Sequence, residues 1–200
     1  MNPTNADPRV ATASARADLV ERARAGDHSA FAILARGSFG RMYGAAKLIL
    51  RDQDRAEDAV QEAMLQAWRH VAALRDPEAW DAWLYRLTIR ACYRQTRRGA
   101  GKDVVALDLT ADRPAPGSDF AGTVVERDRI MAALSGLVLE QRAVIVLHFY
   151  LDLPLTQAAA VLDVPVGTAK SRLHRALEAL RATLGEDPER VASTMRERQA

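Results

Sequence analysis

Hydrophobic residues recur at intervals of three and four positions through most of this chain, which is the period of an amphipathic α-helix. The clearest stripe lies near the C-terminal end and contains Ala169, Leu173, Ala176, Leu177, Leu180 and Leu184. A shorter apolar run at residues 158–162 precedes it, with Thr156 as its expected N-cap. Between them lie Asp163, Val164 and Pro165. Because Asp tolerates the left-handed conformation and Pro cannot continue a helix, the pattern predicts a helix, a tight turn and a longer helix.

The same periodicity predicts further helices in the first half of the chain. Residues 1–12 are polar and are expected to be disordered, and a first helix then covers residues 13–25. Gly26 and Asp27 are expected to stop that helix and to cap the next one, at residues 28–50. A third helix with an acidic start and a fourth that begins near a proline follow.

The composition then changes over residues 99–122, which concentrate Gly, Pro, Ser and Asp as a linker does. The helical pattern resumes after this segment. The sequence therefore predicts an all-α fold of two small helical domains, residues 14–98 and 123–184, joined by a flexible linker. The second domain contains the helix-turn-helix, and residues 185–200 form a polar tail.

Composition and charge exclude several classes of protein. The 200 residues are 48% hydrophobic, which suffices for one or two small cores, and the formal net charge of +2 is unremarkable. Without a run of about 18 apolar residues or a signal-peptide pattern, the protein is expected to be cytoplasmic. Cys92, the single cysteine, cannot form an internal disulfide. We expect no metal, no cofactor and no catalysis, since the sequence has no His/Cys cluster, phosphate-binding loop or nucleophile elbow.

Opposite its apolar stripe, the long C-terminal helix carries hydroxyl and cationic side chains. Such a helix start suits the major groove of DNA, where Arg and Lys pair with guanine acceptors and Ser or Thr serve several bases. The alternative is a solvated basic face on an ordinary helical hairpin. The short turn before the helix favours DNA binding, with contacts expected from Thr168, Lys170, Ser171, Arg172, His174 and Arg175.

The third expected helix begins with more acids than bases. The acids are Asp52, Asp54, Glu57, Asp58 and Glu62, against Arg51 and Arg55. Carboxylates near a helix N-terminus stabilise the helix by about 0.3–1 kcal/mol, which is one explanation. An acidic docking surface is the other.

The fourth expected helix follows Pro77 and combines aromatic residues with arginines, without an acid after Asp81. Basic residues in a last turn complement the helix dipole, so a structural role is open. Five arginines exceed what capping requires, and aromatic rings can stack on bases. The pattern predicts a groove for separated DNA strands, built from Trp80, Trp83, Arg86, Arg90, Arg94, Arg97 and Arg98.

Two stretches carry a family resemblance: AEDAVQEAMLQAW at residues 56–68 and VGTAKSRLHRAL at residues 166–177. They resemble, in this order, regions two and four of bacterial RNA polymerase sigma factors of the extracytoplasmic-function (ECF) group. The similarity extends over about residues 18–98 and 124–184.

This resemblance implies a sigma factor that binds core RNA polymerase, at its clamp helices and flap, and promoter DNA. It implies that the C-terminal helix reads the −35 element, and that the arginine-rich helix and residues 70–78 read and help open the −10 element. Asp58, Gln61 and Glu62 would then face basic groups of polymerase, and Trp68 would pack the interface or its support. Sigma factors of this kind are often held by an anti-sigma partner.

The chain departs from the family pattern at four positions. Ala91 stands where Asn is usual, Val138 where Pro is usual, Gln157 where Glu is common and Ala169 where Val is common. A contact made by the usual Asn is therefore not carried over. His148 lies where relatives often have a basic DNA contact and is a weak candidate, because a histidine side chain carries less positive charge than Lys or Arg at neutral pH.

Two other functions stay open at this stage. A stand-alone helix-turn-helix transcriptional regulator with a helical sensor domain would explain the C-terminal half, but not an acidic helix beside an arginine-rich one. A nucleic-acid-processing enzyme would need paired carboxylates in a metal-site geometry, which the sequence does not show.

Overall fold

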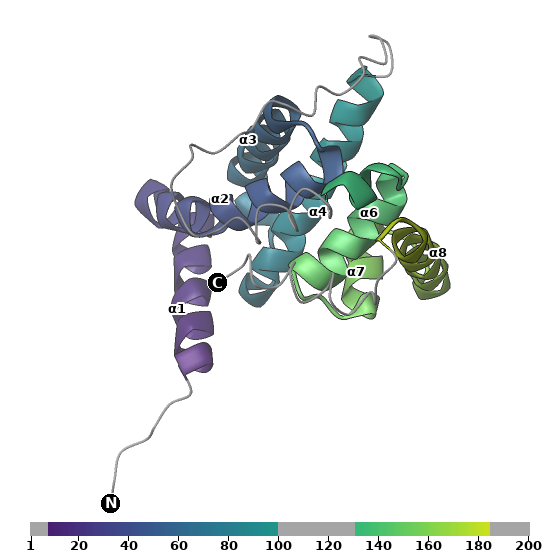
Figure 1. Cartoon of the computed structure of the whole chain (residues 1–200). Coiled ribbons are helices and arrows are strands. Elements are labelled where there is room, and N and C mark those ends of the chain that lie inside the picture. Colours follow the sequence, from purple (N-terminus) through teal and green to yellow (C-terminus); the bar gives the residue numbers. More distant parts are fainter. Residues whose placement is uncertain (1–7, 100–130, 185–200) are drawn as a thin grey trace, which may run out of the picture.

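The computed structural model describes residues 8–99 and 131–184, and every regular element in these ranges is a helix (Figure 1). The α-helices are α1 (Pro8–Arg24), α2 (His28–Leu50), α3 (Gln53–His70), α4 (Trp80–Gly99), α6 (Leu139–Ile145), α7 (Leu155–Leu162) and α8 (Val166–Leu184). Two short 3₁₀ turns, η1 (Val71–Ala73) and η2 (Pro77–Ala79), lie between α3 and α4, and a π-helical turn, η3 (Val146–Tyr150), follows α6. Residues 131–135 are also helical. The expected all-α fold is confirmed.

Two helix starts differ from the expectation. Helix α1 begins at Pro8, inside the segment 1–12 that was expected to be disordered. Proline fits a first helical turn, because its missing N–H would have no partner there. Helix α7 has Pro154 as its N-cap, so the prediction of Thr156 is wrong. The Pro154 carbonyl already accepts a hydrogen bond from the backbone N–H of Ala158 at 2.9 Å, which places Thr156 inside the first turn.

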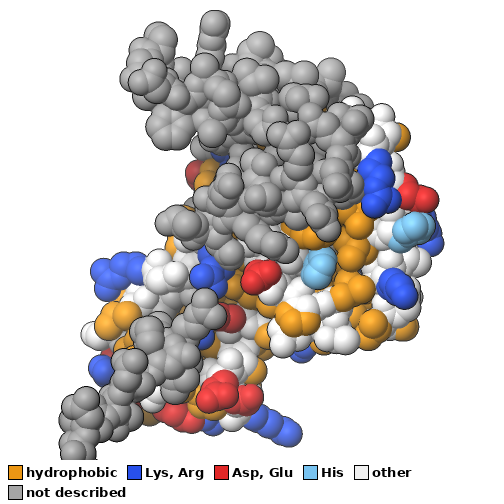
Figure 2. Space-filling model, turned by 60° about the horizontal axis from the view of Figure 1, so that its bottom comes forward, with side chains coloured by type: hydrophobic (Ala, Val, Ile, Leu, Met, Phe, Trp, Pro, Cys, Tyr) orange, Lys and Arg blue, Asp and Glu red, His pale blue; other side chains and the backbone are white. Residues whose placement is uncertain are grey.

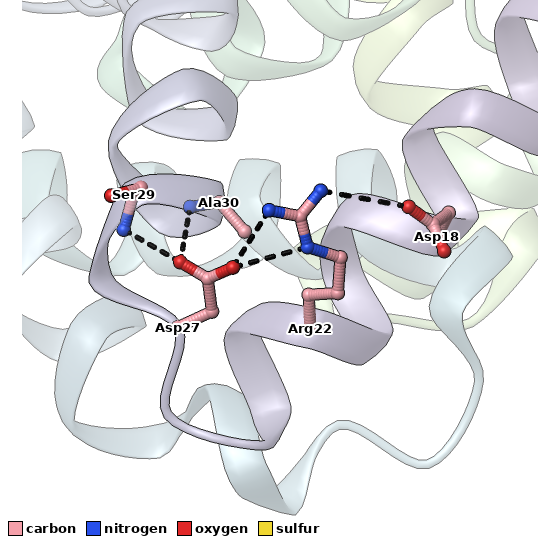
Figure 3. A network of polar contacts seen from close by, with 5 residues as sticks. All are labelled: Asp18, Arg22, Asp27, Ser29 and Ala30. Carbon is pink, nitrogen blue, oxygen red and sulfur yellow. Dashed lines mark hydrogen bonds and ion pairs between the residues drawn. The ribbon is translucent and has the colours of Figure 1, made fainter.

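The corner between α1 and α2 contains the expected stop and cap (Figure 3). Gly26 has a φ of 95°, which glycine adopts without strain. The Asp27 carboxylate accepts hydrogen bonds from the backbone N–H groups of Ser29 at 2.9 Å and Ala30 at 3.0 Å. Arg22 donates to its other oxygen at 2.7 Å. The bond from Ala30, together with the Arg22 guanidinium, lowers the pKa of Asp27.

Small residues let the helices of the first half pack closely. The inner face of α3 is lined by fully buried alanines, where α2 and α4 contact it: Ala56, Ala59, Ala63 and Ala67. Trp80 begins α4 inside this core and is also fully buried. Its indole N–H donates to the Ser38 hydroxyl at 3.3 Å, as a buried indole requires a partner.

The C-terminal half contains the expected helix-turn-helix. Asp163 has φ 57° and ψ 46°, the left-handed conformation that its residue type predicted. The backbone N–H of Asp163 donates to the Ala160 carbonyl at 3.3 Å, and that of Val164 donates to the Ala159 carbonyl at 3.1 Å. These bonds close α7 and turn the chain into α8.

The two expected domains are in direct contact, which the sequence did not predict. Helix α7 packs on α4, while α6 and η3 pack on α2 (Figure 1). One cluster of buried hydrophobic residues includes members of both halves. The packing therefore sets how the two halves face each other.

Some expectations concern residues outside the described ranges. They include the linker from residue 100 to 122 and the tail at residues 185–200. Within the described ranges, no helix combines the length and apolar character that crossing a membrane requires.

Candidate nucleic-acid and polymerase-binding surfaces

Helix α8 turns its expected apolar stripe inward. Ala169, Ala176 and Leu180 are buried, and Leu173 and Leu177 pack against the same core. This burial fixes the rotation of α8 about its axis. The opposite side, with its hydroxyl and cationic residues, is left accessible.

The predicted DNA contacts of α8 differ in exposure. Three of them are exposed and three are half-buried: Lys170, His174 and Arg175, then Thr168, Ser171 and Arg172. The Ser171 hydroxyl donates to the Thr168 carbonyl at 3.0 Å. His174 Nε2 lies 3.4 Å from Glu178 Oε1. On the face shown in Figure 2, the Lys and Arg side chains of the described residues lie dispersed among hydrophobic and acidic ones.

Val166 is a candidate contact that the sequence analysis missed. It is the first residue of α8, and 46% of it is exposed. An apolar side chain at the start of a recognition helix can contact the methyl group of thymine. The sequence does contain a signal for this contact, because Val166 is an apolar residue at the start of the helix and lies outside the buried stripe.

Glu62 joins the two surfaces predicted in the first half. Its Oε1 accepts a hydrogen bond from Arg94 Nε at 2.8 Å, and its Oε2 lies 3.8 Å from Arg98 Nη1. One residue predicted to bind polymerase thus pairs with two predicted to bind DNA. The sequence showed opposite charge on the two helices, but which side chains meet depends on how α3 and α4 pack.

Two further arginines of α4 contact the helix-turn-helix. Arg86 Nη2 donates to the Ala160 carbonyl of α7 at 3.3 Å, and Arg90 Nη2 lies 4.0 Å from Asp163 Oδ2. Arg97 is exposed. Arg86 and Arg94 are therefore hydrogen-bonded within the protein, whereas the side chains of Arg90 and Arg98 stay 56% and 66% exposed.

The two predicted tryptophans of α4 have different surroundings. Trp80 is fully buried, so its predicted contact with DNA is corrected: it is a core residue in this structure. Its burial follows from the packing of α4 on α2, where its indole donates to Ser38 and its ring centroid lies 6.1 Å from that of Phe31. Trp83 is half-buried, with its ring centroid 5.7 Å from that of Trp80.

The outer face of α3 combines polar and apolar residues. Asp58, Gln61, Leu65 and Trp68 are spaced three or four positions apart, so they lie on one side of the helix, and all are exposed. The exposed fractions are 54% for Leu65 and 37% for Trp68. Trp68 also packs edge-on against His28, with ring centroids 4.7 Å apart. The sequence analysis missed Leu65, although an apolar residue on the polar side of a predicted helix can be identified from the sequence.

A groove of about 360 Å³ runs along the seam between α4 and the C-terminal helices. Tyr93 and Arg97 line it from α4, Glu140 from α6 and Arg172 from α8. The Tyr93 hydroxyl is buried and has no hydrogen-bond partner among the described residues. Burial raises its pKa to about 12.

Three remaining positions are accounted for by packing and local hydrogen bonds. Ala91 is fully buried, so the position at which relatives usually carry Asn belongs here to the core. His148 Nδ1 lies 2.8 Å from the Leu153 carbonyl. Cys92 is fully buried, and burial raises its pKa to about 12, which disfavours the reactive thiolate. In the part of the chain that the structure describes, no three His, Cys, Asp or Glu side chains gather as metal ligands.

Comparisons with known proteins match both halves. The family model described as Sigma-70 region 2 matches residues 38–101, and the one described as Sigma-70, region 4 matches residues 127–180. The chain is 32% identical over 169 residues to the ECF RNA polymerase sigma factor SigM of Mycobacterium tuberculosis (strain H37Rv), covering 84% of each. It is 35% identical over 137 residues to SigL of the same organism, covering 68% of this chain and 77% of SigL.

Two solved structures share this fold. CnrH, in complex with the cytosolic domain of CnrY, gives a TM-score of 0.64 at 25% identity, covering 86% of this chain and 99% of CnrH. The sigma factor RpoE from Bartonella quintana, in complex with the anti-sigma factor NepR, gives 0.62 at 27% identity, covering 78% of this chain and 94% of RpoE. Each match covers more of this chain than either half contains, so the similarity in fold includes both halves.

Proposed function

Because this chain belongs to the ECF group of RNA polymerase sigma factors, we propose that α3, α4 and α8 divide the tasks of such a factor among them. A sigma factor gives RNA polymerase its promoter choice, so the protein acts in promoter-specific transcription initiation. Its partners are core RNA polymerase and promoter DNA.

Helix α8 reads the −35 element in this proposal. The observation that carries it is the inward rotation of the apolar stripe, which leaves cations and hydroxyls accessible on the first turns of the helix. The contacting residues are Thr168, Lys170, Ser171, Arg172, His174 and Arg175, with Val166 beside them.

Helix α4 serves the −10 element. The residues are Trp83, Arg86, Arg90, Arg94, Arg97 and Arg98, with Trp80 packing beneath the surface. Extracting a base from the duplex costs a few kcal/mol, so a cationic strand-binding surface is needed to offset it. The ion pairs of Arg94 and Arg98 with Glu62 hold two of these side chains in place before DNA arrives.

The outer face of α3 docks on core polymerase at the clamp helices, and the C-terminal half contacts the flap. Exposed Leu65 and Trp68 form the apolar centre, and Asp58 and Gln61 the polar rim. Interfaces commonly have this anatomy. Glu62 contributes to docking in two ways. Its ion pairs with Arg94 and Arg98 orient α4, and its own negative charge attracts basic groups on polymerase.

Further features follow from the same role. The protein works in the cytoplasm with polymerase and acts by binding alone, leaving all bond formation to polymerase. Residues 14–98 and 123–184 are its two functional units. An anti-sigma partner fits as well, since CnrH and RpoE, which share this fold, were each solved with a bound partner.

The alternative of a stand-alone regulator is not favoured. Such a protein needs the helix-turn-helix but has no use for region 2, which matches residues 38–101. It also leaves the exposed apolar residues of α3 without a function.

Run-off transcription tests the proposal. Core polymerase with this protein should produce a specific transcript from promoters upstream of its own operon, and core polymerase alone should not. A protein that binds these promoters with full specificity on its own, and adds nothing to core polymerase, would instead be a stand-alone regulator.

A further inference from the structure

Helix α1 lies outside the part of the chain that carries the family match. The region 2 model begins at residue 38, whereas α1 covers Pro8–Arg24. The helix is nevertheless packed against the rest of the first half: it contacts α2, and it also contacts η1 and η2, the two turns that lead into α4. Val20 and Ala23 anchor it in the core. A helix outside the matched region is thus built into the approach to the proposed −10 surface.

The two turns that α1 contacts have a buried side and an exposed side. Val71 and Leu74 are buried, whereas Arg75 and Glu78 are exposed. Each turn is a single turn of 3₁₀ helix, and in the first of them the Leu74 N–H donates to the Val71 carbonyl at 3.0 Å. Hydrogen-bond geometry is poorer in a 3₁₀ helix than in an α-helix. We therefore expect these turns to depend on their packing partners for a fixed position.

An ion pair joins α1 to the first turn of α4. Arg16 Nη1 lies 2.9 Å from Asp81 Oδ2, and the two side chains are 39% and 31% exposed. Asp81 follows Trp80, the buried residue with which α4 begins. An ion pair this accessible contributes little to global stability. Breaking it is therefore expected to change local geometry while the protein stays folded.

Helix α2 contributes a second cation to the same cluster. Arg41 Nη1 donates to the Tyr85 hydroxyl at 3.2 Å, and Tyr85 is buried one turn after Asp81 on α4. The hydrogen bond with Tyr85 raises the pKa of Arg41, and the negative charge of Asp81 adds to the rise. One carboxylate at the start of α4 thus interacts with a cation from α1 and with another from α2.

We propose that α1 is a buttress for the start of α4, and that Arg16 and Asp81 are positioning residues for opening the −10 element. The inference rests on the proposed function, which assigns α4 to that element. Extracting a base costs free energy, and groups that are already held in place offset this cost best. Trp83 and Arg86 follow Asp81 directly along α4, so a shift of the first turn displaces both.

A positioning role predicts a selective defect. A variant without the ion pair should still bind core polymerase, because Arg16 and Asp81 lie on α1 and α4 and not on the docking face of α3. The variant should open a duplex promoter more slowly. A promoter that is already unpaired across its −10 element needs no opening, so the defect should largely disappear on that template. A change that merely unfolded the first half would lower transcription from both templates.

The test is run-off transcription by core polymerase with the full-length protein, on the duplex and on the pre-opened template. Arg16→Ala and Asp81→Asn should each slow transcript formation from the duplex about twofold to fivefold, the range expected for one partly exposed ion pair. The double variant should be no slower than Asp81→Asn, because the second change then has no interaction left to remove. Arg16→Lys keeps the charge and should retain most of the wild-type rate.

Glu21→Ala is the matched control. It removes an ion pair of the same helix, at 2.8 Å from Arg24, but that pair stays inside α1. Its rate should equal the wild-type rate on both templates. Circular dichroism checks that each variant is folded, and titration with core polymerase checks that holoenzyme forms. Wild-type rates on the duplex from folded Arg16→Ala and Asp81→Asn would overturn the proposal, as would an equal loss on both templates.

The wild-type reactions separate this inference from the proposed function. A specific transcript from wild type with core polymerase supports the sigma assignment whatever the variants do, and the variants then decide the positioning role alone. The absence of a transcript from wild type on either template would count against the sigma assignment, and the positioning role would fail with it.

Discussion

Glu62 lies within hydrogen-bond or ion-pair distance of Arg94 and Arg98, and that position changes what a mutation there would report. A charge reversal at Glu62 breaks contacts between α3 and α4 as well as any contact with polymerase. Asp58, exposed one turn earlier, forms no ion pair with another of the described residues and is the better probe. At the scale of single residues, the neighbours therefore decide which substitutions can be interpreted.

Asp27 provides a pH-dependent prediction. Hydrogen bonds from the backbone and the Arg22 guanidinium lower its pKa below the ordinary value of 3.8. Its contribution to stability is thus fully present above that value and is lost as the pH falls through the lowered pKa of the folded state. Asp27→Asn keeps a capping oxygen but has no charge to lose. The melting temperatures of wild type and Asp27→Asn are measured by circular dichroism from pH 7 to pH 3. The difference between them should shrink once the pH falls below 3.8, the ordinary pKa of the carboxyl group. A constant difference would mean that the charge of Asp27 does not stabilise the corner.

Helices α3 and α8 present their functional residues in different ways. On α8, the buried stripe is regular and the opposite side is polar, so the amphipathic pattern identifies the accessible face. On α3, Leu65 and Trp68 are apolar yet exposed, and they stand out only because the alanines fill the core side. An exposed apolar centre with charged neighbours indicates a protein partner, whereas exposed cations and hydroxyls indicate DNA.

For α3, we expect Asp58→Arg combined with Leu65→Ala to weaken binding to core polymerase strongly without loss of helicity. Central apolar anchors of interfaces commonly contribute more than about 1 kcal/mol each, and the charge reversal repels basic groups on the partner. Asp18→Arg, a charge reversal at an exposed position of α1, is the control; it also removes the 3.9 Å ion pair with Arg22, so its folding is checked by circular dichroism. Binding is measured by titration of labelled protein with core polymerase. Holoenzyme of wild-type affinity from the double variant would place the docking surface elsewhere.

For α8, Arg175→Ala should cost about 1–3 kcal/mol of promoter binding by the holoenzyme and relax the preference at one upstream position, if the side chain pairs with a base edge. Arg181→Ala, exposed on the same helix but nearer its end, should change binding little. Binding is compared on a matched promoter and on a set with single base changes. An equal loss on every sequence would reassign Arg175 to a phosphate contact.

At the scale of the whole molecule, the contact between the halves and the need for polymerase are connected. In the structure α7 packs on α4, and Arg86 donates to the Ala160 carbonyl across the two halves. Two DNA-binding units gain from each other only when their separation is fixed and matches the DNA. We expect core polymerase to supply that fixed distance.

The free protein should accordingly bind duplex promoter DNA weakly, and that binding should collapse with added salt, as expected for phosphate contacts. The measurement is a salt-series titration of a matched promoter and a scrambled duplex, with and without core polymerase. Specific recognition should appear only with polymerase. Strong discrimination by the protein alone, unchanged by polymerase, would contradict this and restore the stand-alone regulator.

The sequence by itself determined the helices, the left-handed Asp163 turn, the Gly26–Asp27 corner and the accessible face of α8, because each depends on residues within a few positions of one another. The tertiary structure alone decided that Trp80 is a core residue, that Glu62 pairs with Arg94, and that α7 packs on α4 across the two halves. Those contacts join residues far apart in the chain, and which side chains meet depends on helix rotation and close packing. Local periodicity reports which side of a helix is buried, but not against what.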